Sequence, residues 1–292
     1  MIQAPAQQIP GVYHRRIGDI VVSAISDGYL DGSMEVLRGI SVEEGTKMLA
    51  DVFRPARRTS VNTFAVFSAG RVAVIDAGSG TYMGPTAGWQ IRNLRAAGID
   101  PAAIDTVLLT HMHPDHSAGL ADRETGARFF PNAELVAHEN EPRHWLDDAA
   151  MARATEREKL LYFQCAREQI APYRERTRLI TGGEVFPGVT AIPATGHTPG
   201  HTMYLIQSGG ESLLVWGDIT HVPDIQIPRP EVTIAFDTDP AAAIASRRRV
   251  LDMAATERFL VAGMHLHFPA FSRIARHADG YALVTESWVH QF

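Results

Sequence analysis

Short apolar runs that lead into histidine or aspartate recur along this chain, and they constrain its fold more than any other feature. They lie at 104–110, 189–195, 212–218 and 258–264, and they lead into "HMHPDH", His197, Asp218 and His265 in turn. Runs of this length, rich in β-branched residues and bounded by turn formers, are typical of buried strands. We therefore predict that the loops at these strand ends converge on one rim shared by two sheets.

The rest of the chain alternates strands with helices. Further strands are expected at 19–25, 62–68, 71–78, 133–139 and 201–209, with a hairpin at "SGGES". Helices are expected at 85–98, with Pro85 in the first turn, at 239–257, capped by Asp239, and over much of 140–172. This alternation, without a linker, predicts a single α/β domain with mixed sheets over residues 1–292. Segments 29–55 and 140–172 are candidate lids over the site.

Composition excludes several classes of protein. The 292 residues carry 27 basic and 33 acidic side chains, a net charge of -6 that disfavours nucleic-acid binding. The single cysteine, Cys165, allows no intrachain disulfide and is expected to be a buried apolar residue. We find neither a signal peptide nor an apolar run long enough for a membrane span, so a cytoplasmic protein without a membrane partner is expected.

The residue types at the strand ends are those of a metal site. Neutral imidazole and carboxylate are ligands that zinc and similar ions accept, and His111 and His113, two positions apart, can point to the same side. Asp115 and His116 follow on the turn that opens the next helix. A histidine-rich surface loop would explain one such stretch, but four strand ends with ligand chemistry favour metal binding. Zinc is favoured, and manganese, cobalt and iron also suit mixed nitrogen and oxygen ligands.

The chain resembles the metallo-β-lactamase-fold hydrolase superfamily over about residues 60 to 275. The resemblance is carried by "HMHPDH", by Asp76 in "VIDAGSG" before it, and by His197, Asp218 and His265 after it. The resemblance implies a four-layer αβ/βα sandwich of two mixed β-sheets with helices on the outer faces. It also implies a ligand set. His111, His113 and His197 would hold one divalent metal, Asp115, His116 and His265 a second, and Asp218 would bridge them. Asp76 would orient a ligand histidine from outside.

Two such ions can share a water, lower its pKa to near neutrality and direct the hydroxide at an electrophilic carbon or phosphorus. Asp218 and Asp115 are the candidate catalytic carboxylates. The G-x-S-x-G pattern of a serine nucleophile is absent, and no general acid stands out beyond the metals. A leaving group that needs no proton, such as a phenolate, suits such a site.

Two further stretches resemble one branch of this superfamily, which holds lactone and aryl-ester hydrolases of the dihydrocoumarin hydrolase type and methyl parathion hydrolase. These stretches are "GDITHVPDIQIPRPEVTIAFDTDP" and "HLHFPAFSRI". The resemblance implies a small-molecule substrate and a homodimer. The candidate substrate-binding residues are His221, Ile234, Phe236, His267, Phe268 and Trp145. Because these positions are aromatic or large, we expect an aromatic lactone or aryl ester rather than a phosphotriester, with organophosphate hydrolysis as a side activity.

Several alternatives stay open. An organophosphate hydrolase or an acyl-homoserine lactonase would use the same metals. A persulfide dioxygenase-like oxidoreductase would use one iron held by His111, His197 and Asp218, and a binding protein would carry a dead site. Two smaller expectations concern structure: His201 is structural, and Arg247, Arg248 and Arg249 form the solvated face of their helix.

Overall fold

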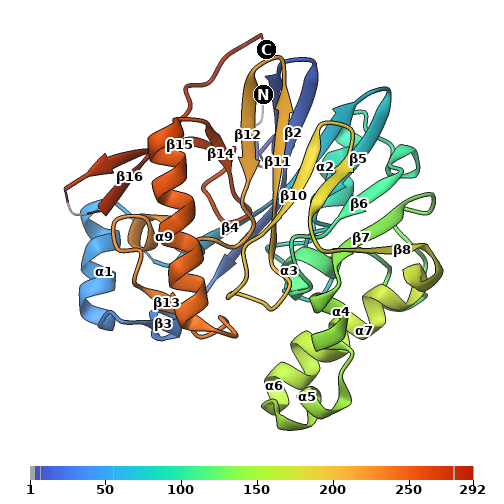
Figure 1. Cartoon of the computed structure of the whole chain (residues 1–292), viewed down its shortest axis with the longest axis horizontal. Coiled ribbons are helices and arrows are strands. Elements are labelled where there is room, and N and C mark those ends of the chain that lie inside the picture. The colour runs from blue at the N-terminus through green and yellow to red at the C-terminus, as the bar shows by residue number, and fades with distance from the viewer. Residues whose placement is uncertain (1–3, 7, 55, 279, 292) are drawn as a thin grey trace.

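A computed structural model describes residues 4–6, 8–54, 56–278 and 280–291. Its core is a pair of seven-stranded sheets that face each other (Figure 1). The first sheet contains β1 (Val12–Ile17), β2 (Ile20–Asp31), β4 (Arg58–Ser68), β5 (Arg71–Ile75), β6 (Thr106–Leu108), β7 (Glu134–His138) and β8 (Thr177–Ile180), in that order. Strands β5 to β8 are parallel and the others antiparallel, so the sheet is mixed.

The second sheet runs in the order β16-β15-β14-β12-β11-β10-β9. Its strands are β9 (Gly183–Phe186), β10 (Val189–Pro193), β11 (Thr202–Ser208), β12 (Glu211–Val215), β14 (Leu260–Ala262), β15 (Phe271–His277) and β16 (Gly280–Thr285). Only β12 and β14 pair in parallel. The predicted hairpin joins β11 to β12, and Gly209 and Gly210 both take the positive φ that a tight two-residue turn requires.

Helices cover the outer faces of both sheets. The α-helices are α1 (Val42–Asp51), α2 (Gln90–Ala96), α3 (Pro114–Ser117), α4 (Asn140–Trp145), α5 (Asp148–Arg153), α6 (Glu156–Glu158), α7 (Cys165–Ile170), α8 (Pro223–Gln226) and α9 (Pro240–Glu257). Shorter turns are η1 (Met34–Val36), η2 (Pro101–Ala103), the π-helical η3 (Lys159–Gln164) and η4 (Ala171–Arg176), and β3 (Leu37–Arg38) pairs with β13 (Thr233–Ile234). No helix in the described ranges is both long and apolar enough to cross a bilayer.

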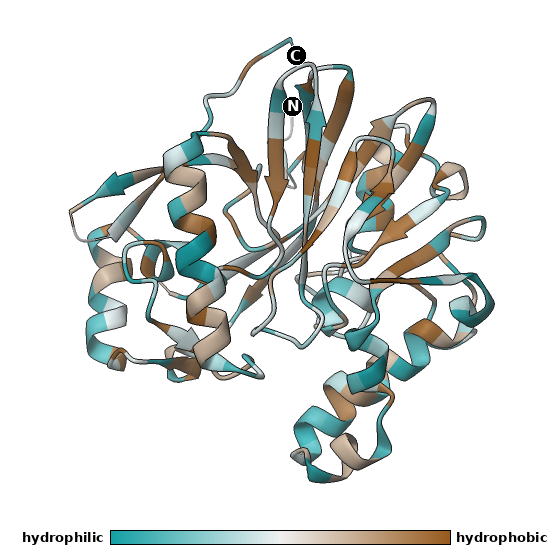
Figure 2. Ribbon diagram, in the orientation of Figure 1, coloured by the Kyte–Doolittle hydropathy of each residue, from teal (hydrophilic) through white to brown (hydrophobic). Residues whose placement is uncertain are grey.

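Side-chain alternation along β4 shows why the molecule has four layers. Phe64 and Val66 point into the core between the two sheets, whereas Ala65, between them, packs with Leu94 of α2 on the outer face. On the far side, Val250 of α9 closes the core of the second sheet. Figure 2 shows hydrophobic residues along the central strands of both sheets and mixed residues along α9. The predicted α/β fold with two mixed sheets is confirmed.

Two local predictions need correction. The helix expected at 85–98 begins at Gln90, because the buried carboxylate of Asp27 accepts hydrogen bonds from the backbone N–H groups of Gly88 and Gln90 and holds the preceding residues as a turn. Arg247 does not lie on a solvated face. Its side chain is buried, and its guanidinium donates to three backbone carbonyl oxygens, whereas Arg248 and Arg249 are exposed.

Other local predictions are confirmed. Asp239 accepts from the backbone N–H of Ala242 as the N-cap of α9, and Pro240 opens that helix. Cys165 is a buried free thiol, and burial raises its pKa.

Candidate metal centre

The predicted ligands come together at one rim, where β6, β10, β12 and β14 end. His111 and His113 follow β6, and α3 then supplies the next two ligands. The second sheet supplies one ligand after each of β10, β12 and β14. We call the whole set the ligand cluster: His111, His113, Asp115, His116, His197, Asp218 and His265. The two sheets therefore each provide part of a single site, as the strand-end pattern predicts.

Three imidazole nitrogens converge on one point in the first half of the cluster. The Nε2 atom of His197 lies 3.2 Å from Nε2 of His111 and 3.0 Å from Nδ1 of His113. Nitrogen ligands about 2.0–2.1 Å from a tetrahedral zinc ion are separated by about 3.3 Å, so this spacing is that of a coordination sphere. All three rings are buried. The three histidines fit a divalent metal with nitrogen preference.

The second half of the cluster adds oxygen ligands. Oδ2 of Asp115 lies 3.6 Å from Nε2 of His116 and 3.4 Å from Nε2 of His265. Oδ2 of Asp218 lies 3.3 Å from Nε2 of His116, 3.1 Å from Nε2 of His265 and 3.3 Å from Nε2 of His197. Asp218 thus stands between the two halves, where a bridging carboxylate would stand.

Buried atoms of the cluster also lack protein partners. Nε2 of His116 and Oδ1 of Asp218 have no hydrogen-bond partner among the described residues. A buried polar atom without a partner is costly, and a metal ion would satisfy both. The donor set, its spacing and these two atoms together fit a pair of divalent cations.

In His116, His197 and His265, the ring nitrogen that faces away from the cluster is held by an outer contact. Nδ1 of His116 lies 2.7 Å from Oδ2 of Asp76, and Nδ1 of His197 lies 2.8 Å from Oδ1 of Asp237. Nδ1 of His265 lies 2.8 Å from the carbonyl oxygen of Ser60. Such contacts leave Nε2 free to bind a metal and fix the orientation of the ring. The structure therefore places Asp76 beside a ligand histidine, where the resemblance expects it.

The pKa values of the cluster reflect how closely its histidines and carboxylates are packed. Burial alone raises the pKa of Asp218, but the surrounding histidines outweigh burial and hold that pKa well below its usual value. Burial lowers the pKa of His197, yet Asp218 and Asp237 outweigh it and raise that pKa to about 9. Positive charge is favoured at this point, and a cation that displaces the protons would provide it.

His201 serves the cluster indirectly. Its Nδ1 donates to the carbonyl oxygen of Ala194 at 2.9 Å, and its Nε2 accepts the backbone N–H of Asp218 at 2.9 Å. Burial, followed by the nearby His197, lowers the pKa of His201 to about 3, so the ring stays neutral and keeps this donor and acceptor pattern. The structural role expected for His201 corresponds to this contact, which positions Asp218.

The profile of the Metallo-beta-lactamase superfamily matches residues 56–265. The chain belongs to this superfamily. Its members with known structures include hydrolase AbOPH, which is 30% identical and superposes with a TM-score of 0.90 over 97% of this chain and 100% of that one. AidC, described as a dizinc quorum-quenching lactonase, is 24% identical and shares the fold with a TM-score of 0.90 over 96% of this chain and 99% of that one.

A curated relative is the uncharacterized protein YobT of Bacillus subtilis (strain 168). It is 29% identical over 159 residues, which are 54% of this chain and 61% of YobT. The match thus spans less than two thirds of that relative.

Part of the ligand cluster lines a cavity of about 370 Å³, which we call the site cavity. Asp115, Asp218 and His265 form part of its floor, and Phe236 and Tyr162 form part of its wall. Residues of both candidate lid segments border it, including Leu30 and Val36 from 29–55 and Leu161 from 140–172. A side cavity of about 340 Å³ adjoins it and shares His113, Tyr162 and Phe236.

The predicted substrate-binding residues divide between these cavities and the core. Phe236 borders both cavities, and Trp145 borders the side cavity with its ring 5.3 Å from that of His113. His221 borders the site cavity but belongs to the cluster itself, since its Nε2 lies 3.0 Å from Oδ2 of Asp218. Its Nδ1 has no hydrogen-bond partner among the described residues, and its ring lies with His197 and Asp218 in a group that could hold a metal.

Three of the predicted pocket residues lie elsewhere. Ile234 is buried against Leu37 in the small core beneath α1 and α8. His267 points away from the cluster and pairs with Asp224 at 2.8 Å, and Phe268 is partly exposed without bordering either cavity. The conformation of the loop after β14 explains the positions of His267 and Phe268.

Asn62 curls that loop by donating to the carbonyl oxygens of Gly263, Met264 and Leu266. His265 and His267, two residues apart, therefore do not share a face, as they would on an extended strand.

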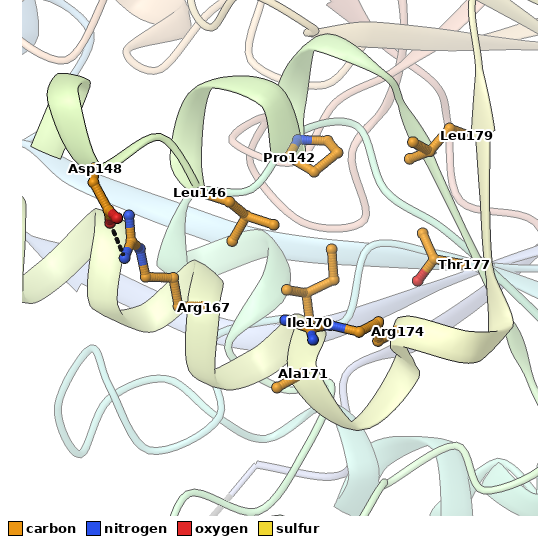
Figure 3. A pocket seen from close by; sticks show the side chains of 9 residues that line it. All are labelled: Pro142, Leu146, Asp148, Arg167, Ile170, Ala171, Arg174, Thr177 and Leu179. Carbon is orange, nitrogen blue, oxygen red and sulfur yellow. Dashed lines mark hydrogen bonds and ion pairs between the residues drawn. The ribbon is translucent and has the colours of Figure 1, made fainter.

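Another cavity, of about 480 Å³, lies outside the cluster between α4, α7 and β8 (Figure 3). Leu146, Ile170 and Leu179 surround it, with an ion pair of Arg167 and Asp148 at one end. None of the ligand cluster lines this cavity. The site cavity, not this one, is therefore lined by the ligand cluster.

Sequence reasoning missed three residues beside the cluster: Tyr162, Asp237 and Glu141. Tyr162 stacks on His113 with ring centroids 4.7 Å apart, although the sequence indicated only a largely helical segment at 140–172. Asp237 lies in "AFDTDP", where it reads as a turn residue. Neither position carries a local sequence signal for its role.

Proposed function

We propose that the protein is a metal-dependent hydrolase that opens aromatic lactones or cleaves aryl esters. The observation that carries this proposal is the lining of the site cavity, which combines the aromatic rings of Phe236 and Tyr162 with Asp218 and His265 of the ligand cluster. A flat aromatic substrate can pack between such rings while its carbonyl group faces the cluster. Divalent metal ions held by the cluster would supply the Lewis acidity that activates water and the carbonyl group.

The protein's own side chains have distinct tasks in this reaction. Burial, followed by the charge of Asp115, raises the pKa of Tyr162 to about 12, so its phenol stays protonated at neutral pH. A protonated phenol at the cavity wall can donate a hydrogen bond to an oxygen of the substrate. Asp218 orients the attacking water, as proposed from the sequence, and His201 holds Asp218 in place through its backbone N–H.

The proposal is tested with a substrate panel on protein reconstituted with zinc, cobalt, manganese or iron. The panel contains dihydrocoumarin, an aryl ester, an acyl-homoserine lactone, an aryl phosphotriester and a β-lactam. We expect the aromatic lactone or the aryl ester to give the highest kcat/KM and chelators to abolish turnover. A phosphotriester or β-lactam at the top would contradict the proposal, and oxygen uptake with one iron per chain would replace it with the oxidoreductase alternative.

Two variants test the role of the cavity wall. Phe236→Ala should raise KM for dihydrocoumarin about tenfold, because packing of an aromatic ring against the substrate contributes about 1–2 kcal/mol to the binding free energy. Phe259→Ala, at a partly buried aromatic residue packed against the main core, is the matched control and should leave KM unchanged. Equal KM values for the two variants would remove Phe236 from the substrate site.

The side cavity favours a second candidate substrate. Trp145, Ala150, Ala154 and Phe163 form its apolar side, with Arg153 and Glu158 beside them, and it shares Tyr162 with the site cavity. An acyl chain attached to a lactone ring would fit against this apolar side, so acyl-homoserine lactones are the second candidate. Ala154→Phe would fill the side cavity and should lower kcat/KM for long acyl chains while sparing dihydrocoumarin. A homodimer and a cytoplasmic location stay predictions from the sequence.

A further inference from the structure

Glu141 is a fully buried carboxylate outside the ligand cluster that sequence analysis did not select. It lies in α4, and its two oxygen atoms accept four hydrogen bonds. Oε2 accepts from the backbone N–H of Met112 and from Nε1 of Trp145, each at 2.8 Å. Oε1 accepts from Oγ1 of Thr198 at 2.5 Å and from the backbone N–H of Gly200 at 2.8 Å.

These contacts place Glu141 between two loops that carry metal-ligand candidates. Met112 separates the ligands His111 and His113, and Thr198 directly follows the ligand His197. The two loops come from different sheets, after β6 and after β10. One carboxylate therefore links the two segments whose three imidazole nitrogens converge at 3.0–3.2 Å.

The loop after β10 is shaped for this contact. A Cβ atom at Gly200 would lie 2.8 Å from Cγ and 3.0 Å from Oε1 of Glu141, closer than real side chains approach one another. Glycine is what lets the backbone N–H of residue 200 reach the carboxylate. Asn140, the neighbour of Glu141, adds a hydrogen bond to the carbonyl oxygen of Pro199 at 3.4 Å.

From this geometry we infer that Glu141 is a positioning residue, which holds His111, His113 and His197 in a metal-binding arrangement by tying their two loops to α4. All four partners donate hydrogen bonds and none carries a positive charge. Only a carboxylate offers two acceptor oxygens to four donors. The inference rests on the metal-dependent function proposed above, because its readout is the metal site.

Glutamine at position 141 makes this requirement testable. An amide has one oxygen and one NH₂ group, so it can satisfy only one pair of donors. We expect the amide oxygen to keep Met112 and Trp145, which are donors only. The NH₂ group would then face Thr198, whose hydroxyl can rotate to accept, and Gly200, whose N–H would lose its partner. The damage should fall on the loop that carries His197.

The experiment compares Glu141→Gln with Glu139→Gln, a nearby glutamate at the start of the same helix that contacts only Arg143, at 3.6 Å, in the described ion pairs. Metal-free proteins are loaded with cobalt(II), and metal affinity is measured by competition with a chelating dye. We expect Glu141→Gln to bind the metal 10–100-fold more weakly and to show a changed ligand-field absorption spectrum, since outer contacts of ligands carry effects of that size. Glu139→Gln should match the wild type in both measurements.

A role in folding alone would give a different result. The thermal midpoint of metal-free Glu141→Gln would then fall while its cobalt spectrum and affinity stayed those of the wild type, and this outcome would overturn the inference. Thr198→Val, which removes one neutral donor, keeps the question answerable if Glu141→Gln does not fold. It should weaken cobalt binding in the same direction and by less, and unchanged binding would also overturn the inference. A wild-type protein that binds no metal would instead overturn the proposed function.

Discussion

Arg247 offers a quantitative test of how the frame behind Asp218 is held. Its guanidinium is buried in α9 and donates to the carbonyl oxygens of Ile219 at 2.6 Å, Pro230 at 2.9 Å and Val232 at 2.8 Å. Replacing it with methionine keeps the apolar stem and leaves the carbonyl groups of Ile219 and Pro230 without a described donor, whereas the carbonyl of Val232 keeps its hydrogen bond from Nε2 of Gln226. Each unpartnered group costs about 1–3 kcal/mol, so the two cost about 2–6 kcal/mol, and relief from burying the guanidinium offsets part of this cost.

We therefore expect Arg247→Met to lower the free energy of unfolding by about 2–4 kcal/mol, which corresponds to a midpoint about 5–15 °C lower for a chain of this size. The measurement is urea unfolding of metal-free protein in excess chelator, because bound metal would add its own stabilisation. Arg248→Met, an exposed neighbour on the same helix, is the control and should change stability by less than about 0.5 kcal/mol. If both variants unfold within about 1 kcal/mol of each other, the hydrogen bonds of Arg247 do not hold this region.

Two further predictions concern buried carboxylates outside the ligand cluster. Burial raises the pKa of Asp27 from 3.8 to about 6. Between these pH values the folded state therefore holds a proton that the unfolded state has released. The free energy of unfolding of the metal-free protein should then fall by up to about 3 kcal/mol as the pH rises from about 4 to about 6. Asp27→Asn should flatten this fall in urea unfolding across the pH series, and an unchanged slope would contradict the assignment. Asp237→Asn should weaken zinc binding 10–100-fold in a dye competition assay, because Nδ1 of His197 loses a carboxylate partner. Asp239→Asn, which keeps a good helix cap, should bind zinc like the wild type, and equal affinities for the two variants would refute the role of Asp237.

The sequence predicts the frame of the molecule well because strand ends are local features. The apolar run before His111 and the run that ends on Asp218 each combine a strand signal with a ligand in one short stretch. Within each sheet, parallel neighbours such as β5 and β6, or β12 and β14, direct their following loops to one edge, so ligands far apart in sequence were expected to meet. The helix cap at Asp239 is equally local, and it was also predicted.

Contacts made through tertiary structure could not be predicted in this way. Arg247 was placed in solvent because "SRRRV" looks like a charged helix face, whereas its partners are carbonyl groups from the loops after β12 and α8. Glu141 serves loops from both sheets, and nothing in "HENEP" distinguishes it from Glu139. His267 was misplaced because the curl imposed by Asn62, 205 residues before it in the chain, has no local signature.

The ligand cluster follows strand ends, while much of the lining of the site cavity comes from segments outside the two sheets, around residues 32–36, 157–162 and 236. Under the proposed function, the residues for reactivity and those for selectivity therefore lie in separate parts of the chain. A duplicated copy could exchange one substrate for another by mutations in the lining segments alone, and the side chains proposed to hold the cations would stay unchanged at every step.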